Sequence, residues 1–166
     1  MAFDTYVELT GIEGEATAKS FEKKIEIFSF SWGASSPVTI GPGSAGISAS
    51  RVSISSFNVM KKTDVASPKL FKACCLGEHL AKMIVSMRKQ TGVGGQDVFL
   101  TYTFEQVMVE SVQWSGSSGG DDTPTESVSF AFAKVTVHYK AQGPDGKLTA
   151  GTPVMWDVTK VSAGNA

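Results

Sequence analysis

Apolar and polar residues alternate along several segments of this chain, which is the period of two expected for a β-strand with one buried face. Glycine- and proline-containing stretches separate these segments and predict turns. We expect about seven strands, over residues 3–9, 25–33, 51–61, 80–89, 96–114, 126–140 and 154–158. Segments with the helical period of apolar residues do not alternate with these strands. The pattern therefore favours antiparallel pairing over a parallel β/α arrangement.

The segment 25–33 has two faces of different chemistry. Phe28, Phe30 and Trp32 share one face, and Ser29 and Ser31 share the other with Gly33. The aromatic residues are expected to pack in the core, which is the commonest place for such residues at strand spacing. The small polar face suits a wall that borders water, either in a channel or on the outside of a solitary sandwich.

One helix is predicted between the strands. Ser67 is placed as its N-cap and Pro68 as its first helical residue, and Gly77 is placed to end it in a left-handed conformation. The helix is expected over residues 69–76. The fold class that follows is mainly β, an antiparallel barrel or sandwich of about seven strands with one flanking α-helix.

The alternation changes parity inside the last long strand. Phe130 and Phe132 are at even positions, whereas Val135 and Val137 are at odd positions. A one-residue change of this kind predicts a β-bulge in residues 126–140.

Residues 35–50 have no strand or helix period and are rich in glycine, proline and serine. A connection of this length usually has a function of its own. Val38, Ile40 and Ile47 are its apolar side chains, and we expect them to contact another subunit. A flexible surface loop without a partner is the alternative.

Composition limits the classes of protein that fit. A chain of 166 residues with 42% hydrophobic residues is enough for one core, so residues 1–166 are expected to form a single domain. The formal net charge of −1 excludes the basic surface that nucleic acid binding requires. Neither a signal peptide nor an apolar stretch of membrane-spanning length is present in the sequence, so we expect a protein that starts in the cytoplasm and does not insert into a membrane.

Two motifs match catalytic or nucleotide-binding patterns only by letter. Residues 41–46 fit G-x-G-x-x-G, but a β-like segment follows where a helix is required. Ser118 lies in a G-x-S-x-G match, with Asp122 and His138 following in the order of hydrolase triads. Pro124 and the glycines after Ser118 prevent the helix that this motif needs. We therefore expect no enzyme and no cofactor.

The cysteines do not indicate a metal site or an exported disulfide fold. Cys74 and Cys75 are adjacent, and neighbouring residues are too constrained to form an easy disulfide with each other. Cys75 and His79 are four residues apart, but Gly77 is expected to end the helix between them. Two ligands do not complete a zinc site, so no metal is predicted.

Five segments of the chain, in this order and at these distances, resemble one known family. They are residues 6–14 (YVELTGIEG), 25–33 (IEIFSFSWG), 67–79 (SPKLFKACCLGEH), 109–116 (VESVQWSG) and 126–139 (ESVSFAFAKVTVHY). Together they resemble the Hcp family (haemolysin-coregulated protein) of type VI secretion systems, over essentially the whole chain.

The resemblance implies a structural subunit of the secretion tube. Such subunits form hexameric rings that stack, carry effector proteins in the lumen, lie beneath the valine-glycine repeat spike and within the contractile sheath, and are secreted with their cargo. Ser31 matches the lumen position of the family, and Ser29 lies beside it on the same face. The family uses loops on one face of the ring for the contact between rings, so the resemblance implies that the loop with Val38, Ile40 and Ile47 mediates stacking.

Two other functions remain open from the residues alone. One is a monomeric ligand-binding β-domain that would use Trp32, Trp114 and Trp156. The other is a hydrolase that would use Ser118, Asp122 and His138. Fold class alone does not decide among these functions.

Overall fold

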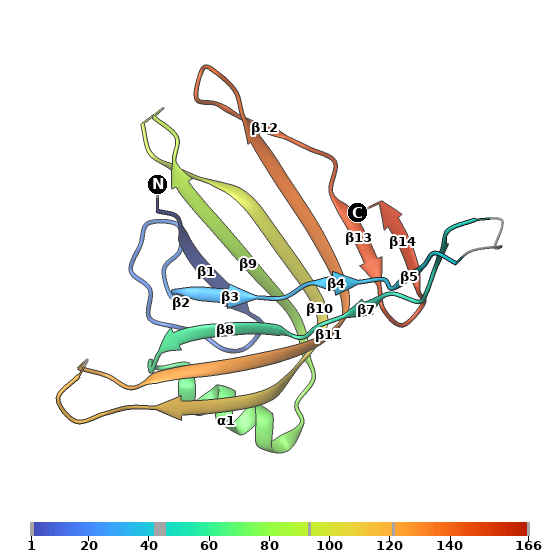
Figure 1. The fold of residues 1–166 in the computed structure, drawn as a ribbon. Helices are drawn as coiled ribbons and strands as arrows, with labels where there is room; N and C mark the ends of the chain where they lie inside the picture. The colour runs from blue at the N-terminus through green and yellow to red at the C-terminus, as the bar shows by residue number, and fades with distance from the viewer. Residues whose placement is uncertain (1, 42–45, 93, 121, 166) are drawn as a thin grey trace.

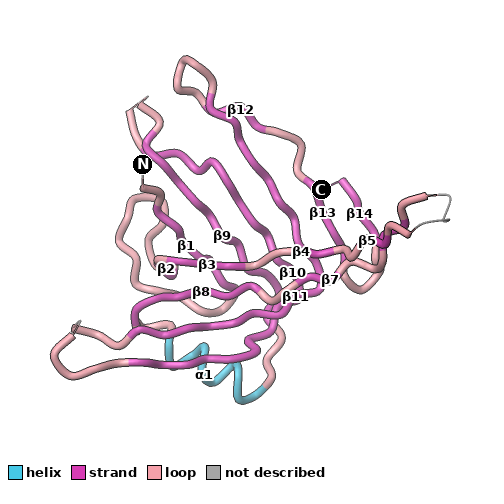
Figure 2. Tube along the Cα trace, viewed as in Figure 1, coloured by secondary structure: helices cyan, strands magenta, loops and turns pink. Residues whose placement is uncertain are grey.

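The computed structural model describes residues 2–41, 46–92, 94–120 and 122–165 of the chain (Figures 1 and 2). This part contains one helix, α1 (Ser67–Leu76), and fourteen strands. The strands are β1 (Asp4–Leu9), β2 (Ile25–Ile27), β3 (Ser29–Ser31), β4 (Ala34–Ser35), β5 (Val38–Thr39), β6 (Ser48–Ala49), β7 (Ser53–Ile54), β8 (Phe57–Lys62), β9 (Leu80–Gln90), β10 (Gln96–Ser115), β11 (Thr125–Gln142), β12 (Leu148–Ala150), β13 (Val154–Asp157) and β14 (Ser162–Asn165).

The long strands β10 and β11 form the centre of the architecture. They pair antiparallel from Leu100 opposite Tyr139 to Ser115 opposite Thr125. The strand order across the main sheet is β14-β13-β11-β10-β9-β1-β2, and β8 and β3 continue from β11 in a second direction. Figure 1 shows the two resulting layers, one with β9 and β1 and the other with β8 and β3. β10 and β11 run through both.

The predicted fold class is confirmed as a mainly β, antiparallel fold with one helix. In the described part of the chain the sheets do not close into a barrel, so the sandwich alternative applies. β2 and β3 lie at two ends of the pairing order and are separated in sequence only by Phe28. The backbone N–H of Phe28 donates to the carbonyl of Met60 in β8, at 3.0 Å.

Aromatic and aliphatic side chains fill the space between the layers. Phe57 and Phe104 are fully buried, with ring centroids 4.8 Å apart. Trp32 packs edge-on against Phe104 and Phe132, at 5.6 and 6.1 Å between centroids. Edge-to-face aromatic pairs of this kind stabilise a fold by about 0.5–1.5 kcal/mol beyond the contribution of the apolar area that they bury. The prediction that Phe30 and Trp32 pack on the core is confirmed.

Residues 25–33 differ from the single strand that was predicted. β2 pairs with β1, whereas β3 pairs with β8, so the chain changes layers at Phe28. The change of neighbour also changes which positions face the core. The odd-numbered Ile25 and Ile27 are buried in β2, whereas the even-numbered Phe30 and Trp32 pack on the core farther along the chain. Phe28 is 59% exposed, so the prediction that it is a core residue was wrong.

The bulge predicted in residues 126–140 has its extra residue on the neighbouring strand β10 and not on β11. β11 keeps one register with β10 from Tyr139 to Phe130, and the register shift lies between Val109 and Ser111 of β10. The parity of the buried residues changes because β11 passes between layers. Residues 125–130 pair with β8 and residues 134–137 pair with β13.

The helix begins two residues earlier than expected. Ala66 is the N-cap, without a side-chain hydrogen bond, and Ser67 is already helical. Pro68 lies in the first turn, as predicted, and Gly77 ends the helix with φ of 64°. Glycine adopts this left-handed conformation without the steric cost that a side chain adds. The prediction of Ser67 as N-cap was wrong, because its hydroxyl bonds to the charged groups described next.

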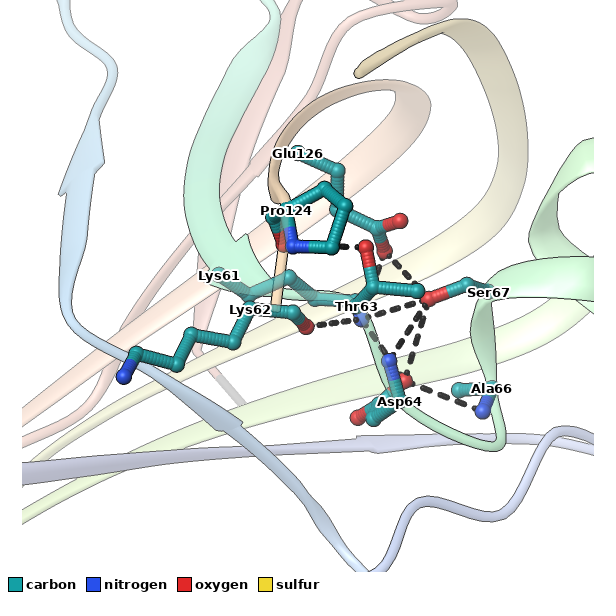
Figure 3. A network of polar contacts seen from close by, with 8 residues as sticks. All are labelled: Lys61, Lys62, Thr63, Asp64, Ala66, Ser67, Pro124 and Glu126. Atoms are coloured by element: carbon teal, nitrogen blue, oxygen red, sulfur yellow. Dashed lines mark hydrogen bonds and ion pairs between the residues drawn. The ribbon is translucent and has the colours of Figure 1, made fainter. Parts of the chain in front are cut away.

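A cluster of charged and polar side chains is buried where α1 meets β8 and β11 (Figure 3). The ammonium of Lys61 lies 2.7 Å from Asp64 Oδ1 and 2.5 Å from Glu126 Oε1. The Ser67 hydroxyl donates to Glu126 Oε1 at 2.8 Å and accepts from the Asp64 N–H at 3.0 Å. The side chains of Lys61 and Glu126 are 1% and 0% exposed. This cluster connects the start of the helix to two strands that are distant in sequence.

A buried charge is expensive unless opposite charges and hydrogen bonds compensate it. Lys61 Nζ also donates to the carbonyl of Lys62, at 3.0 Å, so its donors have oxygen partners on several sides. The lysine carries one positive charge, whereas Asp64 and Glu126 are both carboxyl groups. Removal of the ammonium would leave both carboxyl groups without their common partner.

We expect Lys61→Met to lower the free energy of unfolding by about 3–5 kcal/mol, the usual effect of breaking a buried ion pair from one side. Lys134→Met is the matched control, because Lys134 pairs with Glu105 at 3.1 Å and both side chains are about one-third exposed. An exposed pair contributes about 0–1 kcal/mol. Urea unfolding at one fixed protein concentration measures both variants, and equal losses would contradict the role given to the cluster.

Candidate functional surfaces

A polar face extends across β3, β8, β11 and β10. Ser31 lies opposite Asn58, Asn58 lies opposite Ser129, and Ser129 lies opposite Ser111. Directly opposed residues on neighbouring antiparallel strands point to the same side of a sheet. The adjacent row on this side consists of Ser29, Met60, Ser127 and Gln113. We call these eight residues the serine face.

The opposite side of the same strands is apolar. The row between the two polar rows contains Phe30, Val59, Val128 and Val112. Val59 and Val128 are buried in the core, which also contains Leu70 of α1. The helix therefore packs on the apolar side of this layer, and the serine face points away from it.

The serine face is neutral and its side chains are mostly short. Ser29 and Ser31 are exposed, as predicted, and Asn58 and Ser129 are half-buried. The Ser129 hydroxyl donates to Asn58 Oδ1, and the Asn58 amide donates to the Ser56 carbonyl at 3.1 Å. Hydroxyl and amide groups with such local partners give a wettable surface without a fixed charge. This chemistry suits contact with many different partners more than tight binding of one ion.

Sequence reasoning identified two of the eight members of this face. The alternation of Ser127 and Ser129 with Val128 and Phe130 was a signal that could have found two more. That signal gives the face of one strand only. Register decides that Ser31, Asn58 and Ser129 form one row.

Residues 34–41 and 46–54 form a projecting hairpin, which we call the arm. Figure 1 shows it extending beyond the main body of the fold, on the side of β13 and β14. β4 pairs with β7 at its base, and β5 pairs with β6 farther out. The Ser50 N–H donates to the Pro37 carbonyl at 2.7 Å, and the Ser36 hydroxyl donates to the Ser50 carbonyl at 2.8 Å.

The expectation of an unpatterned loop over residues 35–50 was therefore wrong for the described residues. Paired segments of two residues are too short to give a recognisable period. Part of the segment, residues 42–45, lies outside the described residues.

The outer part of the arm has one apolar face. Val38 lies opposite Ala49, so these two side chains share a side, whereas Thr39 and Ser48 share the other. Ile40 directly follows β5 and Ile47 directly precedes β6. Ile40 is 76% exposed and Ile47 is 72% exposed. Large aliphatic side chains gathered on a projecting element are typical of a contact surface.

An apolar groove of about 310 Å³ lies at the base of the arm. Its residues come from the arm, from Trp32 and from the neighbouring strands β11 and β13. They are Trp32, Ala34, Val52, Ile54, Val135, Val137, Val154, Met155 and Trp156. Val154, on the rim, is 61% exposed.

The turn after β13 fixes the wall of the groove that contains Trp156. Asp157 Oδ1 accepts hydrogen bonds from the Thr159 hydroxyl at 2.6 Å, the Thr159 N–H at 2.9 Å and the Lys160 N–H at 3.0 Å. The bond from the Thr159 hydroxyl, followed by that from the Lys160 backbone, lowers the pKa of Asp157 below its ordinary value. The ionised carboxylate thus organises the connection between β13 and β14.

The comparisons with known proteins agree with this geometry. The profile of the family described as "Type VI secretion system effector, Hcp" matches residues 6–139. Protein hcp1 of Pseudomonas aeruginosa is 33% identical over 151 residues, which are 91% of each chain. The chain belongs to the Hcp family.

Solved structures of Hcp proteins and related secretion proteins have the same architecture. A type six secretion system protein aligns with a TM-score of 0.92 and 34% identity, over 98% of this chain and all of that chain. Hcp1 from Salmonella typhimurium aligns with a TM-score of 0.76 and 28% identity, over 99% of this chain and all of that one. Type VI secretion Hcp proteins are secreted tube proteins, and the family is not known as a family of enzymes. No helix in the described part of the chain is long and apolar enough to cross a bilayer.

The residues of the hydrolase hypothesis lie far apart in this Hcp protein. Ser118 is in the loop before β11, whereas His138 lies thirteen residues beyond the start of that strand. At about 3.3 Å per residue, this is roughly 40 Å along the strand. The His138 Nε2 atom lies 3.1 Å from the carbonyl oxygen of Gly151. The serine and histidine therefore do not form a catalytic pair.

The metal hypothesis concerned Cys75 and His79. Cys75 lies in α1, whereas His79 lies beyond Gly77, where the helix ends. Cys74 packs against β10, with its thiol 3.5 Å from the Glu110 carbonyl. In the described ranges, no group of three or more potential ligands surrounds a metal position. The glycine motif of residues 41–46 falls largely outside the described residues.

We expect Ser118→Ala and His138→Ala to leave the hydrolysis rate of ester and peptide substrates unchanged from that of the parent protein. The physical reason is the separation of the two side chains along β11. Purified parent and variant proteins measured on the same substrate panel provide the test. A parent rate that falls to the buffer background in both variants would establish a catalytic role for them.

Proposed function

We propose that this Hcp protein assembles into hexameric rings that stack into the inner tube of a type VI secretion system. In this proposal the lumen of the ring binds and protects small effector proteins until the tube is expelled. The observation that carries the proposal is the serine face, a neutral wall across four strands with the core and the helix behind it.

The serine face is the candidate lumen surface, with Ser31 and Ser29 at its β3 edge. A lumen that carries different effectors benefits from short hydroxyl side chains, because they leave space and do not repel a particular charge. Water can also remain between such a wall and its cargo, and bridging waters are nearly as favourable as direct hydrogen bonds. The arm is the candidate stacking element, because its apolar face is uncovered in the single chain.

The same proposal includes the other components of the secretion machine. The valine-glycine repeat spike would cap the stack of rings, and the contractile sheath would surround it. The protein would be cytoplasmic before firing and would leave the cell with its cargo through the type VI system. Neither a cofactor nor a metal is required for this function.

We expect light scattering of the purified protein to give a mass six times that of the 17.6 kDa chain. The edges at β14 and β3 leave backbone groups that a neighbouring subunit can pair or cover, and a cyclic arrangement satisfies every copy equally. The measurement at several micromolar concentrations separates a stable ring from weak association. A mass of 17.6 kDa throughout would contradict the proposal.

We expect Ser31→Arg to preserve the ring mass and to reduce co-purification of a cognate effector at least tenfold. The long cationic side chain would project from the serine face into the proposed lumen. Lys72→Arg is a suitable control, because Lys72 is an exposed residue of α1, on the other side of this layer. Unchanged effector recovery with the Ser31 variant would remove the serine face from the lumen.

A further inference from the structure

One member of the serine face differs from the others in its chemistry. Met60 has a thioether, whereas the other seven residues have a hydroxyl or an amide group. Its side chain is 39% exposed. Ser29 and Ser127 lie directly opposite Met60 on the two neighbouring strands. These hydroxyl neighbours give the thioether little apolar surface to pack against, so much of Met60 remains available to a partner.

Lys62 continues the same side of β8 beyond Met60, because residues two apart on a strand share a face. It lies opposite Thr125, which in turn lies opposite Ser115. Lys62 is exposed, and Figure 3 shows its side chain extending away from the buried cluster. In the described part of the chain, the Lys62 ammonium has no ion-pair partner. The serine face is therefore bordered, next to Met60, by an uncompensated positive charge.

A carboxylate near the other end of the face already has a partner within the chain. Glu110 directly precedes Ser111 on β10, and its Oε2 atom accepts a hydrogen bond from the Ser56 hydroxyl at 2.5 Å. Lys62 is the charged group of this side that is left for a contact from outside the chain. The charge that a partner must complement here is positive.

These two side chains define the chemistry of a matching surface. The thioether of methionine is flexible and polarizable, so it adapts to aliphatic and aromatic partners of different shapes. An exposed ammonium favours a carboxylate, and such complementarity contributes mainly to the selection of a partner. Met60 and Lys62 are two residues apart on β8, which is roughly 7 Å along a strand. A matching surface has an apolar side chain and a carboxylate at about this separation.

We propose that Met60 and Lys62 form a recognition pair that selects the cargo of the serine face. The selected class is effector proteins that present an aliphatic or aromatic side chain beside a carboxylate. This inference rests on the proposed function and names the class of effector that the candidate lumen retains. The hydroxyl and amide groups around the pair accept many surfaces, whereas the pair disfavours cargo that is basic at this position. Each subunit of a ring repeats the pair, so contacts that are weak singly add together.

Binding of short labelled peptides tests the pair directly. The first probe is fluorescein-labelled Gly-Ser-Leu-Ser-Glu-Ser-Gly, in which the apolar and acidic side chains have the spacing of alternate residues in an extended chain. In the second probe lysine replaces the glutamate, and in the third serine replaces the leucine. We expect fluorescence anisotropy with the purified protein to give at least fivefold tighter binding of the first probe than of either other one. Equal binding of all three probes, or no binding of the first, would refute the recognition pair.

Variants of the chain separate the apolar contact from the charged one. We expect Met60→Ser and Lys62→Gln each to weaken binding of the first probe at least fivefold, and Met60→Leu and Lys62→Arg to preserve it. Leu76→Ser and Lys69→Gln are matched controls without effect, because these exposed residues lie on α1, on the other side of the layer. A loss with Met60→Leu equal to that with Met60→Ser would contradict the apolar contact.

Salt dependence gives an independent measurement of the charged contact. Mobile ions screen an exposed ammonium, so raising sodium chloride from about 0.05 to 0.5 M should weaken binding of the first probe by the parent and by Lys62→Arg. Binding by Lys62→Gln should change little over the same range. Equal salt dependence of the parent and Lys62→Gln would show that Lys62 does not contact the carboxylate.

Light scattering and effector recovery distinguish failure of this inference from failure of the proposed function. Rings that retain a cognate effector equally well in the parent, Met60→Ser and Lys62→Gln would contradict only the recognition pair. A monomeric mass together with no selectivity among the probes would contradict both proposals. Selective binding of the first probe by a monomer would support the recognition pair and contradict the hexamer. Rings with at least fivefold lower effector recovery in both variants are the expected result.

Discussion

β11 divides one of its edges among three neighbours, β8 along residues 125–130, β13 along residues 134–137 and β12 along residues 140–142. Its other edge stays paired with β10 over most of its length. This division produces the two layers, because the neighbours of β11 lead to β3 in one direction and to β14 in the other. The aromatic core fills the angle between the layers, where Phe104, Phe132 and Trp32 meet. The serine face, the arm and the groove all take their positions from this one strand.

The layer with β8 combines an uncharged outer face with a charged interior. Ser31, Asn58 and Ser129 border solvent on one side, whereas Lys61 and Glu126, on the same strands, are buried beside α1. The exposed side gains from small neutral groups that do not select a partner by charge. The buried side requires matched charges, because an ammonium away from water must have oxygen partners. These opposite demands explain why polar residues at neighbouring positions have such different environments.

The groove has its origin in the same division of β11. Val135 and Val137 face Trp32 and the base of the arm because the second half of β11 pairs with β13. β13 contributes Trp156 and Val154, and the hydrogen bonds of Asp157 fix the turn that follows. The base of the arm therefore packs against apolar side chains, whereas its outer part is exposed. An element that is apolar on one side along its length, but covered only at its base, is suited to contact with another subunit.

The sequence by itself determined the longer strands, the helix and the type of fold, since alternation, a proline in the first turn and Gly77 as C-cap are local properties of the chain. It also identified Ser29 and Ser31 as an exposed polar pair, from the alternation along one strand. Only the tertiary structure decided what depends on a neighbouring strand. Phe28 is exposed because the chain changes layers there, and Ser67 bonds to Glu126, which is 59 residues away in sequence. The row through Asn58 and Ser129, the pairing within the arm and the groove beneath it likewise follow from register and long-range contacts, which a local pattern of apolar and polar residues does not specify.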